Sequence, residues 1–368
     1  RSLWNDLAKT NAQYAIWGDP RVEDEENDEA FSDSGRDEAM RLTSFVHPSS
    51  RVVDLGCGIG RVTRELAPFV GEIIGVDVSD EMIEEGKKYL GETANARLIL
   101  NDGATLAAIE SDSVDFLFSL LCLIHADKRC AYRYMREIKR VLKPGGQTLL
   151  QFHNMLSDRG LKLFQAIVDS DYPLEFYTPA EVRRLLGSVG LEVLSENLNS
   201  EFIDVVALNG SRRDWIEEWL SAVSIGAPKF DGAWRKGAIA MDRAGRSSLE
   251  IENRAGSWKL LTVVIELLRT HENAFEQIFC VQGRVQLKPT SKSSVSVQFD
   301  PAQEEVALLV DGKPAIAMEA KVGAPGRGDR GLLNIGCIPA GASWTEETRE
   351  SLPGFARTIE VELLEDLT

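Results

Sequence analysis

A chain of 368 residues in which 43% are hydrophobic and 27% are charged has the composition of a folded globular protein. Its formal net charge of -17 opposes binding to a nucleic-acid polymer, because such binding depends on Lys and Arg side chains at the phosphates. No apolar run reaches the ~20 residues that span a bilayer, and the first residues lack the layout of a secretory signal, so we expect a cytoplasmic protein with no membrane span. The five cysteines are widely spaced and form no C-x-x-C pair, which indicates reduced thiols and no metal site.

The N-terminal residues 1–50 contain two stretches with helical patterns, 3–17 and 33–46. We predict that they form an N-terminal helical cap, which is a candidate lid over the carboxyl edge of the sheet that follows. The acidic run 21–30 between the two stretches is interpreted as a solvated segment.

Residues 51–209 alternate short apolar runs with longer amphipathic stretches. This alternation is typical of parallel strands joined by crossover helices, and it predicts an α/β domain with a sheet covered on both faces. The last of the helices begins at Thr178, an expected N-cap, followed by Pro179 in its first turn. The predicted strands are 51–56, 72–79, 96–102, 114–123, 146–153, 191–197 and 202–209, and the helices between them include 61–70, 80–91, 131–146 and 178–190.

The pattern changes after about residue 210. Residues 210–245 read as a linking helix followed by an irregular segment, and 246–368 contain runs typical of strands, the clearest being 294–299 and 305–320. Asp311-Gly312 lies between two apolar runs, which is a strong signal for a β-hairpin. We predict a C-terminal β-sandwich, jelly-roll-like in arrangement.

A glycine-rich turn, "VVDLGCGIGR" at residues 52–61, follows the first predicted strand and opens a helix. This is the context of a cofactor-binding loop, although a tight turn without a ligand is the competing interpretation. Gly56, Gly58 and Gly60 give the spacing G-x-G-x-G, which departs from the dinucleotide fingerprint, and no Lys-Ser/Thr pair follows as in a P-loop. The sequence therefore disfavours NAD, FAD and ATP.

Two carboxylates follow the next strands. Asp77 ends the second predicted strand, where an acidic residue can accept hydrogen bonds from both hydroxyls of a ribose. Asp102 ends the third, in a position to receive the exocyclic amine of a purine. Because ligands of open α/β sheets bind beyond the carboxyl ends of the strands, these residues and the glycine turn predict a nucleoside site at one edge of the sheet.

In this order and at these distances, the motifs resemble those of class I S-adenosylmethionine-dependent methyltransferases over about residues 35–207. The resemblance implies S-adenosylmethionine as the cofactor and a Rossmann-like sheet of seven strands whose last hairpin inserts one antiparallel strand. It rests on five segments: "VVDLGCGIGRVTRELA", "IIGVDVSDEMIEEG", "LNDGATL", "SVDFLFSLLCLIHADK" and "EIKRVLKPGGQTLLQF".

The same resemblance implies roles for individual residues around the cofactor. By region these are Gly56, Gly58 and Gly60 beneath it, Asp77 at the ribose, Asp102 and Gly103 at the adenine, Val78 and Met82 on the adenine ring, Leu121 near the methionine portion, Asp54 at the ammonium group, and Gly35 with Arg36 at the carboxylate.

Methyl transfer requires alignment of a nucleophile with the methyl group and, for a hydroxyl acceptor, a general base. His125 and His153 follow the fourth and fifth predicted strands, and a pKa near neutrality suits them to proton transfer. The competing interpretation for each is a strand-end histidine bound to backbone or water. Candidate acceptor contacts, each with packing as its alternative, are Tyr14, Trp17, Asn154 and Tyr177.

The C-terminal strands resemble lectin-like sandwiches, which implies an acceptor that is a glycan or a sugar-containing small molecule. A first alternative is an N- or O-methyltransferase of a natural product or another small metabolite, with the tail serving dimerisation or as a lid. A second is a scaffold that binds S-adenosylmethionine without turnover.

Overall fold

The computed structural model describes residues 2–17, 28–170, 172–199, 201–211, 213–214, 218, 222–225, 246–271, 274–300, 305–314, 317–322, 330–339 and 356–362. The chain divides into two compact units, Arg1–Trp215 and Ile216–Thr368, and each is considered by itself. Much of the predicted linker 210–245 lies outside the described residues, so the boundaries proposed there stay predictions.

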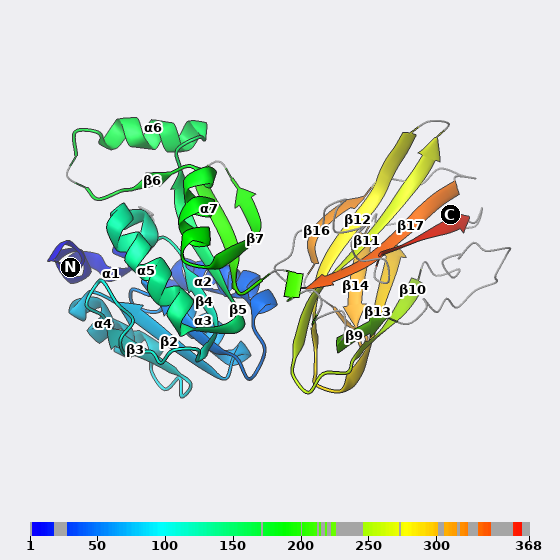
Figure 1. The fold of residues 1–368 in the computed structure, drawn as a ribbon, viewed down its shortest axis with the longest axis horizontal. Coiled ribbons are helices and arrows are strands. Elements are labelled where there is room, and N and C mark those ends of the chain that lie inside the picture. Colours follow the sequence, from blue (N-terminus) through cyan, green and yellow to red (C-terminus); the bar gives the residue numbers. More distant parts are fainter. Residues whose placement is uncertain are drawn as a thin grey trace. The chain divides into compact units, whose positions relative to one another are not determined.

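The first unit is built on one mostly parallel sheet with the strand order β3-β2-β1-β4-β5-β8-β7, and β6 pairs with β5 (Figure 1). Strand β8 runs antiparallel to both β5 and β7, which is the inserted antiparallel strand that the sequence predicts. The strands are β1 (Arg51–Leu55), β2 (Glu72–Asp77), β3 (Ala96–Leu100), β4 (Val114–Ser119), β5 (Leu142–Asn154), β6 (Phe176–Tyr177), β7 (Leu191–Leu198) and β8 (Phe202–Asn209). The Rossmann-like α/β fold is therefore confirmed.

Helices cover both faces of this sheet. They are α1 (Ser2–Trp17), α2 (Asp28–Leu42), α3 (Arg61–Leu66), α4 (Asp80–Leu90), α5 (Lys128–Val141), α6 (Asp158–Ile167) and α7 (Pro179–Ser188). The start of α7 is fixed as predicted, because Thr178 and Glu181 form a reciprocal capping box. None of the helices in the described part of the chain is long and apolar enough to cross a membrane.

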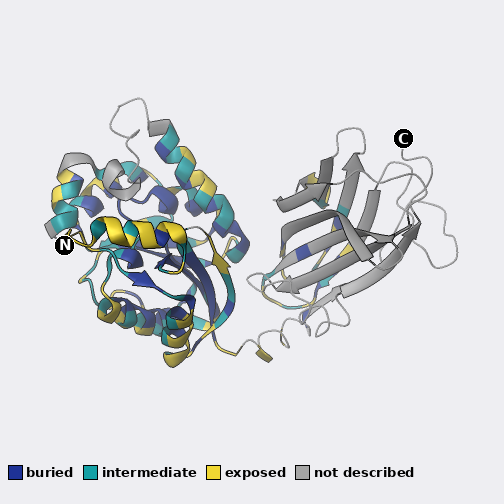
Figure 2. Cartoon of the chain, turned by 90° about the horizontal axis from the view of Figure 1, so that it is seen from above, coloured by how far each residue is buried: buried dark blue, intermediate teal, exposed yellow. Residues whose placement is uncertain are grey.

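The core has two layers because alternate residues of a strand point to opposite faces. Val53 packs in the layer that contains apolar residues of α5 and α7, whereas its neighbour Val52 packs in the layer that contains those of α2 and α3. Both valines are fully buried, and burial of such a side chain contributes about 1.5–3 kcal/mol. The central strands are accordingly dark blue in Figure 2. This two-sided burial holds the carboxyl ends of the strands in fixed positions.

The end of α5 differs from the sequence prediction. The helix stops at Val141, and β5 already begins at Leu142, whereas the sequence predicted that the helix ends at the Pro-Gly-Gly break of residues 144–146 and that the strand begins at residue 146. The extra strand residues are held by pairing, since Leu142 pairs with Val114 of β4 and its carbonyl accepts from Asn209 Nδ2 at 2.6 Å.

The second unit contains two five-stranded sheets, in the orders β15-β14-β13-β10-β9 and β16-β12-β11-β17-β18, with antiparallel pairing throughout. The predicted hairpin is present, because Val310 pairs with Lys313 across Asp311 and Gly312, whose φ angles are 50° and 77°. The sandwich arrangement stays a prediction. The strands are β9 (Val223–Ile225), β10 (Arg246–Asn253), β11 (Lys259–His271), β12 (Ala274–Leu287), β13 (Ser291–Asp300), β14 (Glu305–Val310), β15 (Lys313–Pro314), β16 (Ala317–Val322), β17 (Arg330–Pro339) and β18 (Ala356–Glu362).

Candidate active site

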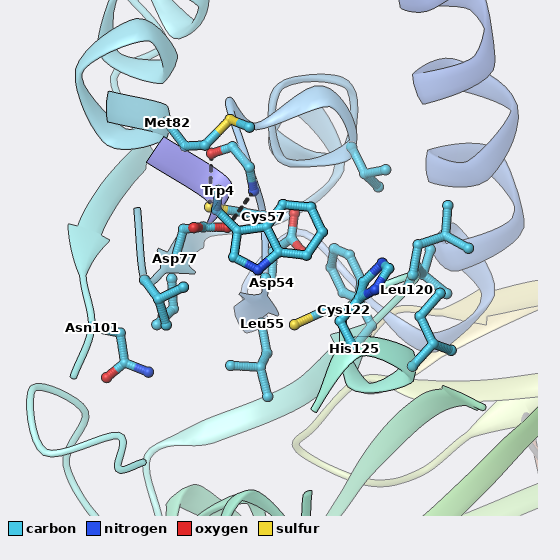
Figure 3. Close-up of a pocket in the computed structure, with 18 of the residues that line it drawn as sticks. Trp4, Asp54, Leu55, Cys57, Asp77, Met82, Asn101, Leu120, Cys122 and His125 are labelled. Atoms are coloured by element: carbon cyan, nitrogen blue, oxygen red, sulfur yellow. Dashed lines mark hydrogen bonds between the residues drawn. The ribbon is translucent and has the colours of Figure 1, made fainter. Parts of the chain in front are cut away.

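A cavity of about 260 Å³ lies beyond the carboxyl ends of β1, β2 and β4 (Figure 3). Its wall comes from the glycine turn after β1, the end of β2, the segment 120–125 after β4, and helix α1. The sheet order reverses between β1 and β4, which is where open α/β sheets bind their ligands.

The glycine turn forms one side of the cavity. Gly56, Gly58 and Gly60 have φ angles of 80°, 55° and 87°, a region in which a Cβ atom is strained. The Gly56 N–H donates to the carbonyl of Val76 at 2.7 Å, which ties the turn to β2. A Cβ atom on Gly56 would also clash with the side chain of Cys122, which lines the cavity as well. Glycine is therefore required at position 56 by its backbone angle and by a protein neighbour.

Gly56→Ala is expected to lower the free energy of unfolding by at least about 2 kcal/mol, because strain at a positive φ adds to the overlap with Cys122. Gly145→Ala is the matched control, since Gly145 has the same φ of 80° and open space around it. Urea unfolding should give a loss of only about 1 kcal/mol for this control, which is the strain of a Cβ atom at a positive φ alone. Equal losses for the two variants would show that Cys122 plays no part.

The carboxylate of Asp77 is fixed at the edge of the cavity. Its Oδ2 accepts the Gly58 N–H and its Oδ1 accepts the Ser79 N–H, both at 2.9 Å. Burial raises the pKa of Asp77, and these backbone hydrogen bonds oppose the rise. Each oxygen keeps a lone pair, so the carboxylate can still accept two hydroxyl groups.

Asp54 and Arg61 form a buried pair of groups beside the turn. Asp54 Oδ2 accepts from Thr63 Oγ1 at 2.6 Å, and burial raises the pKa of Asp54 to about 7. Arg61 is only 6% exposed and donates to Ser34 Oγ at 3.1 Å. Its Nε has no hydrogen-bond partner among the described residues. A buried guanidinium with a free donor fits an anionic group such as a carboxylate.

The structure assigns Gly35 and Arg36 to positions other than the predicted cofactor contact. A Cβ on Gly35 would lie 2.6 Å from the Arg61 carbonyl oxygen, so Gly35 allows α2 to pack against Arg61. Arg36 is exposed, and its guanidinium pairs with Asp33 at 2.6 Å and Glu65 at 3.7 Å. Neither residue lines the cavity, and Arg61 is the arginine that does.

The end of the cavity near β2 and β3 is lined by Val78, Met82 and Asn101. The predicted Asp102 is instead exposed, and its carboxylate accepts the N–H groups of Ala104 and Thr105, which lowers the pKa of Asp102. Asp102 and Gly103 do not line the cavity. Asn101, which donates to Tyr134 Oη at 2.9 Å, was not predicted, although it also ends β3 in the sequence.

His125 lines the other end of the cavity. Its Nδ1 lies 2.9 Å from the carbonyl oxygen of Pro173, and a carbonyl can only accept, so in the neutral ring Nδ1 carries the proton and Nε2 the lone pair. Burial lowers the pKa of His125, which keeps the ring neutral near pH 7. The neighbouring Leu121 also lines the cavity, with φ 54°, and its N–H donates to Gln151.

Two aromatic side chains meet His125 edge to face. Its ring centroid lies 4.7 Å from that of Trp4 and 5.7 Å from that of Tyr172, and both residues line the cavity. Trp4 and His125 are seen together in Figure 3. The described wall around His125 is therefore aromatic and apolar, with Leu120 and Ile124 beside it.

Helix α1 carries Trp4 and is anchored on the start of α4. Asn5 Nδ2 donates to Asp80 and Asn5 Oδ1 accepts from Ser79 Oγ, both at 2.6 Å. The predicted aromatic contacts from this helix, Tyr14 and Trp17, have side chains outside the described part of the structure. Trp4, at the start of the helix, was not predicted, because its position at the cavity depends on the anchoring of α1 by Asn5.

His153 lies outside the cavity wall and packs in the interior instead. It is 3% exposed, and its ring stacks on those of Phe176 and Phe202 with centroids 5.1 Å away in each case. Burial lowers the pKa of His153 to about 4. We therefore assign no catalytic role to His153.

Asn154 and Tyr177 are likewise buried away from the cavity. Asn154 Oδ1 accepts the Leu156 N–H at 3.0 Å, and the Tyr177 ring packs on Phe152 with centroids 4.9 Å apart. These contacts give both residues packing roles, so the predicted acceptor contacts are corrected.

The sheet order and the position of the glycine turn and Asp77 agree with the resemblance to class I S-adenosylmethionine-dependent methyltransferases. Residues 52–146 match the model of a family described as methyltransferase domain. The chain is 28% identical over 153 residues to phosphoethanolamine N-methyltransferase 1 of Triticum aestivum, covering 41% of this chain and 29% of that protein. It is 25% identical over 187 residues to 2-methyl-6-phytyl-1,4-hydroquinone methyltransferase of Synechocystis, covering 48% and 54% respectively, so it spans about half or less of these two relatives.

Among solved structures, an S-adenosylmethionine-dependent methyltransferase from Mesorhizobium loti shares 18% identity and a TM-score of 0.41, covering 48% of this chain and 99% of that one. The cofactor of the domain is S-adenosylmethionine. The residues present fit it, because Asp77 keeps lone pairs for ribose hydroxyls and Arg61 Nε is a buried donor without a partner among the described residues.

Proposed function

We propose that the protein transfers the methyl group of S-adenosylmethionine to a hydroxyl of a small-molecule acceptor, with His125 as the general base. The cofactor supplies a methyl group already activated on a sulfonium. The observation that carries the proposal is the hydrogen bond from His125 Nδ1 to Pro173, which leaves Nε2 as a proton acceptor in a ring that lines the cavity. A hydroxyl loses its proton as it attacks, so a positioned base contributes about 10²–10⁴-fold.

In this proposal the turn at Gly56 to Gly60 lies beneath the cofactor, and Asp77 accepts the ribose hydroxyls. Val78 and Met82 pack on the adenine, and the polar side chain at that end is Asn101. Support for these roles is that all these residues line one cavity, apart from Gly60, which completes the turn.

The amino-acid part of the cofactor would lie toward Asp54 and Arg61, a carboxyl group and a guanidinium in the same wall. Asp54 suits the ammonium group and Arg61 the carboxylate. Burial raises the pKa of Asp54 to about 7, so its carboxyl group is partly protonated near neutral pH. A nearby ammonium group would lower this pKa again and favour the ionised carboxylate.

The acceptor would lie between His125, Trp4 and Tyr172. Their rings favour a planar or apolar acceptor, because a sugar presents hydroxyls that require several polar partners. The glycan acceptor suggested by the C-terminal strands has no supporting observation in this wall, and the named relatives act on phosphoethanolamine and a hydroquinone. An N-methyltransferase and a non-catalytic scaffold are the alternatives that the test must separate.

The test combines calorimetry with transfer of labelled methyl from S-adenosylmethionine to a panel of phenols, hydroquinones, amines and sugars. We expect one cofactor bound per chain and transfer to phenols or hydroquinones. Binding without transfer to any member would favour the scaffold, and transfer only to amines or sugars would overturn the proposed acceptor.

A further inference from the structure

Exposed apolar side chains are concentrated in one stretch of the methyltransferase unit. Of the eight large apolar side chains that are exposed in the described residues, five lie between positions 156 and 172. Isolated exposed apolar residues are ordinary, but a contiguous group marks a binding surface. We call this group the apolar strip, and its members with their exposed fractions are Leu156 (71%), Leu161 (42%), Phe164 (38%), Val168 (64%) and Tyr172 (40%).

Helix α6 presents most of the strip on one face. Leu161, Phe164 and Val168 follow one another at spacings of three and four residues, which places them side by side on a helix. Gly160 lies on the buried side of the helix, so the strip flanks the side that packs on the protein. Figure 1 shows α6 at the margin of the unit, beyond β6.

The strip and the cavity share one residue in the segment that follows α6. Tyr172 belongs to the strip and also lines the cavity, where its ring meets His125. Four residues later, the ring of Phe176 contacts Phe164 edge to face, with centroids 5.5 Å apart. Tyr172 therefore belongs both to the cavity wall at the proposed acceptor end and to the strip, and Phe176 links the same segment to α6.

We propose that the apolar strip binds a hydrocarbon chain carried by the methyl acceptor. The acceptor is then an amphiphile whose hydroxyl-bearing head reaches His125 and whose chain passes Tyr172 and lies along α6. This inference rests on the proposed function, because it uses His125 to position the head. A ten-residue helix is about 15 Å long, so it can cover a chain of comparable length.

The residue shared with the cavity favours the acceptor's own chain over a separate partner. The charges near the strip argue against docking on an anionic membrane. Arg159 and Lys162 of α6 are balanced by Asp158 and Asp169, Arg159 is also paired with Glu201 at 2.8 Å, and the chain has a net charge of -17. A protein partner or a second copy would need no link to His125, whereas Tyr172 provides one.

The probe is a series of 4-alkylphenols from methyl to octyl, kept below the concentrations at which they aggregate. Their binding to the full chain is measured by calorimetry with S-adenosylhomocysteine present. We expect the affinity to rise about two- to fourfold for each added methylene. The upper value corresponds to full burial of the CH₂ group and the lower value to partial burial. In the double variant Leu161→Gln with Val168→Gln this rise should be largely lost, while methylphenol binds as in the wild type.

Phe69→Gln is the control, because Phe69 is another exposed large apolar side chain, at 37%, and it lies before β2, a strand that pairs with β1 and β3 rather than with β5 or β6. It should keep the chain-length dependence. An affinity independent of chain length, or an unchanged dependence in the double variant, would overturn the inference. The inference would also be overturned if light scattering showed that the wild type is a dimer and the double variant a monomer. Binding of the protein to neutral vesicles, without binding of monomeric alkylphenols, would overturn it as well.

Methyl transfer is followed in parallel to keep the two proposals distinguishable. Chain-dependent binding without transfer to any phenol contradicts the proposed function. Transfer to methylphenol with no gain from a longer chain contradicts the apolar strip as a chain site and leaves the proposed function standing.

Discussion

Asp77→Asn is expected to weaken the binding of S-adenosylhomocysteine by roughly 100-fold or more, because two charge-assisted hydrogen bonds to the ribose are lost at about 1.5–3 kcal/mol each. The backbone N–H groups of Gly58 and Ser79 donate to the two different oxygens of this carboxylate, and an Asn side chain has only one acceptor oxygen, so the amide cannot reproduce the arrangement. Calorimetric titration with the product measures the affinity directly and needs no acceptor.

Asp102→Asn is the control for this experiment, since Asp102 is exposed and its oxygens bond within their own turn. We expect the affinity of this variant for S-adenosylhomocysteine to stay within about threefold of the wild-type affinity, a difference of about 0.7 kcal/mol or less. Thermal unfolding of both variants checks that each is folded. Similar affinities for the Asp77 variant and the wild type would remove the ribose assignment.

His125→Gln is expected to lower kcat by about 10²–10⁴-fold toward a hydroxyl acceptor, which is the contribution of a positioned general base. Cofactor affinity should change little, because His125 lines the acceptor end of the cavity and not the end near Asp77. The measurement is kcat with the acceptor found in the panel, together with calorimetry of the cofactor.

The pH profile distinguishes a base from a residue that only shapes the cavity. The active form is the neutral ring, and burial lowers the pKa of His125 from its ordinary value of 6.5, with the Pro173 hydrogen bond opposing the shift. With S-adenosylmethionine saturating, so that its ammonium group keeps Asp54 ionised, kcat/KM of the wild type for the acceptor is therefore level near pH 7 and falls as the pH drops through this lowered pKa. The limb at low pH should be absent in His125→Gln.

His153→Phe is the matched control, since it keeps an aromatic ring between Phe176 and Phe202. It should retain both the rate and the pH limb. If the fall of kcat/KM at low pH disappeared in His153→Phe, or persisted in His125→Gln, then His125 would not be the general base.

The fold of the first unit was largely predictable because each local signal agreed with the sheet. Continuous apolar runs gave the buried parallel strands, and the capping residues at Thr178 fixed the start of a helix within one residue. The glycine turn and Asp77 were predictable for the same reason, since their positions follow directly from where β1 and β2 end.

Side-chain direction at a strand end was not predictable. Asn101 and Asp102 are adjacent, and only the path of the chain after β3 decides which of them lines the cavity. His125 and His153 both lie beyond or at the end of a strand, but His153 is enclosed by Phe176 and Phe202, which are remote in sequence. Such choices depend on tertiary neighbours that a pattern of residues does not contain.

Trp4 and Arg61 illustrate a second limit. Trp4 reaches the cavity only because Asn5 anchors α1 on the start of α4, an interaction across more than 70 residues. Arg61 lines the cavity because Gly35 lets α2 pack against it, whereas the sequence favoured the neighbouring Arg36. In both cases a contact between distant segments selects the functional side chain.

The two ends of the cavity wall are encoded in different stretches of the chain. In the proposed function, most of the wall at the cofactor end comes from residues 54–82, while Tyr172 and the Pro173 carbonyl at the acceptor end come from the segment between β5 and β6. Substitutions in that segment would then change which acceptor is methylated and leave the affinity for the cofactor unaltered.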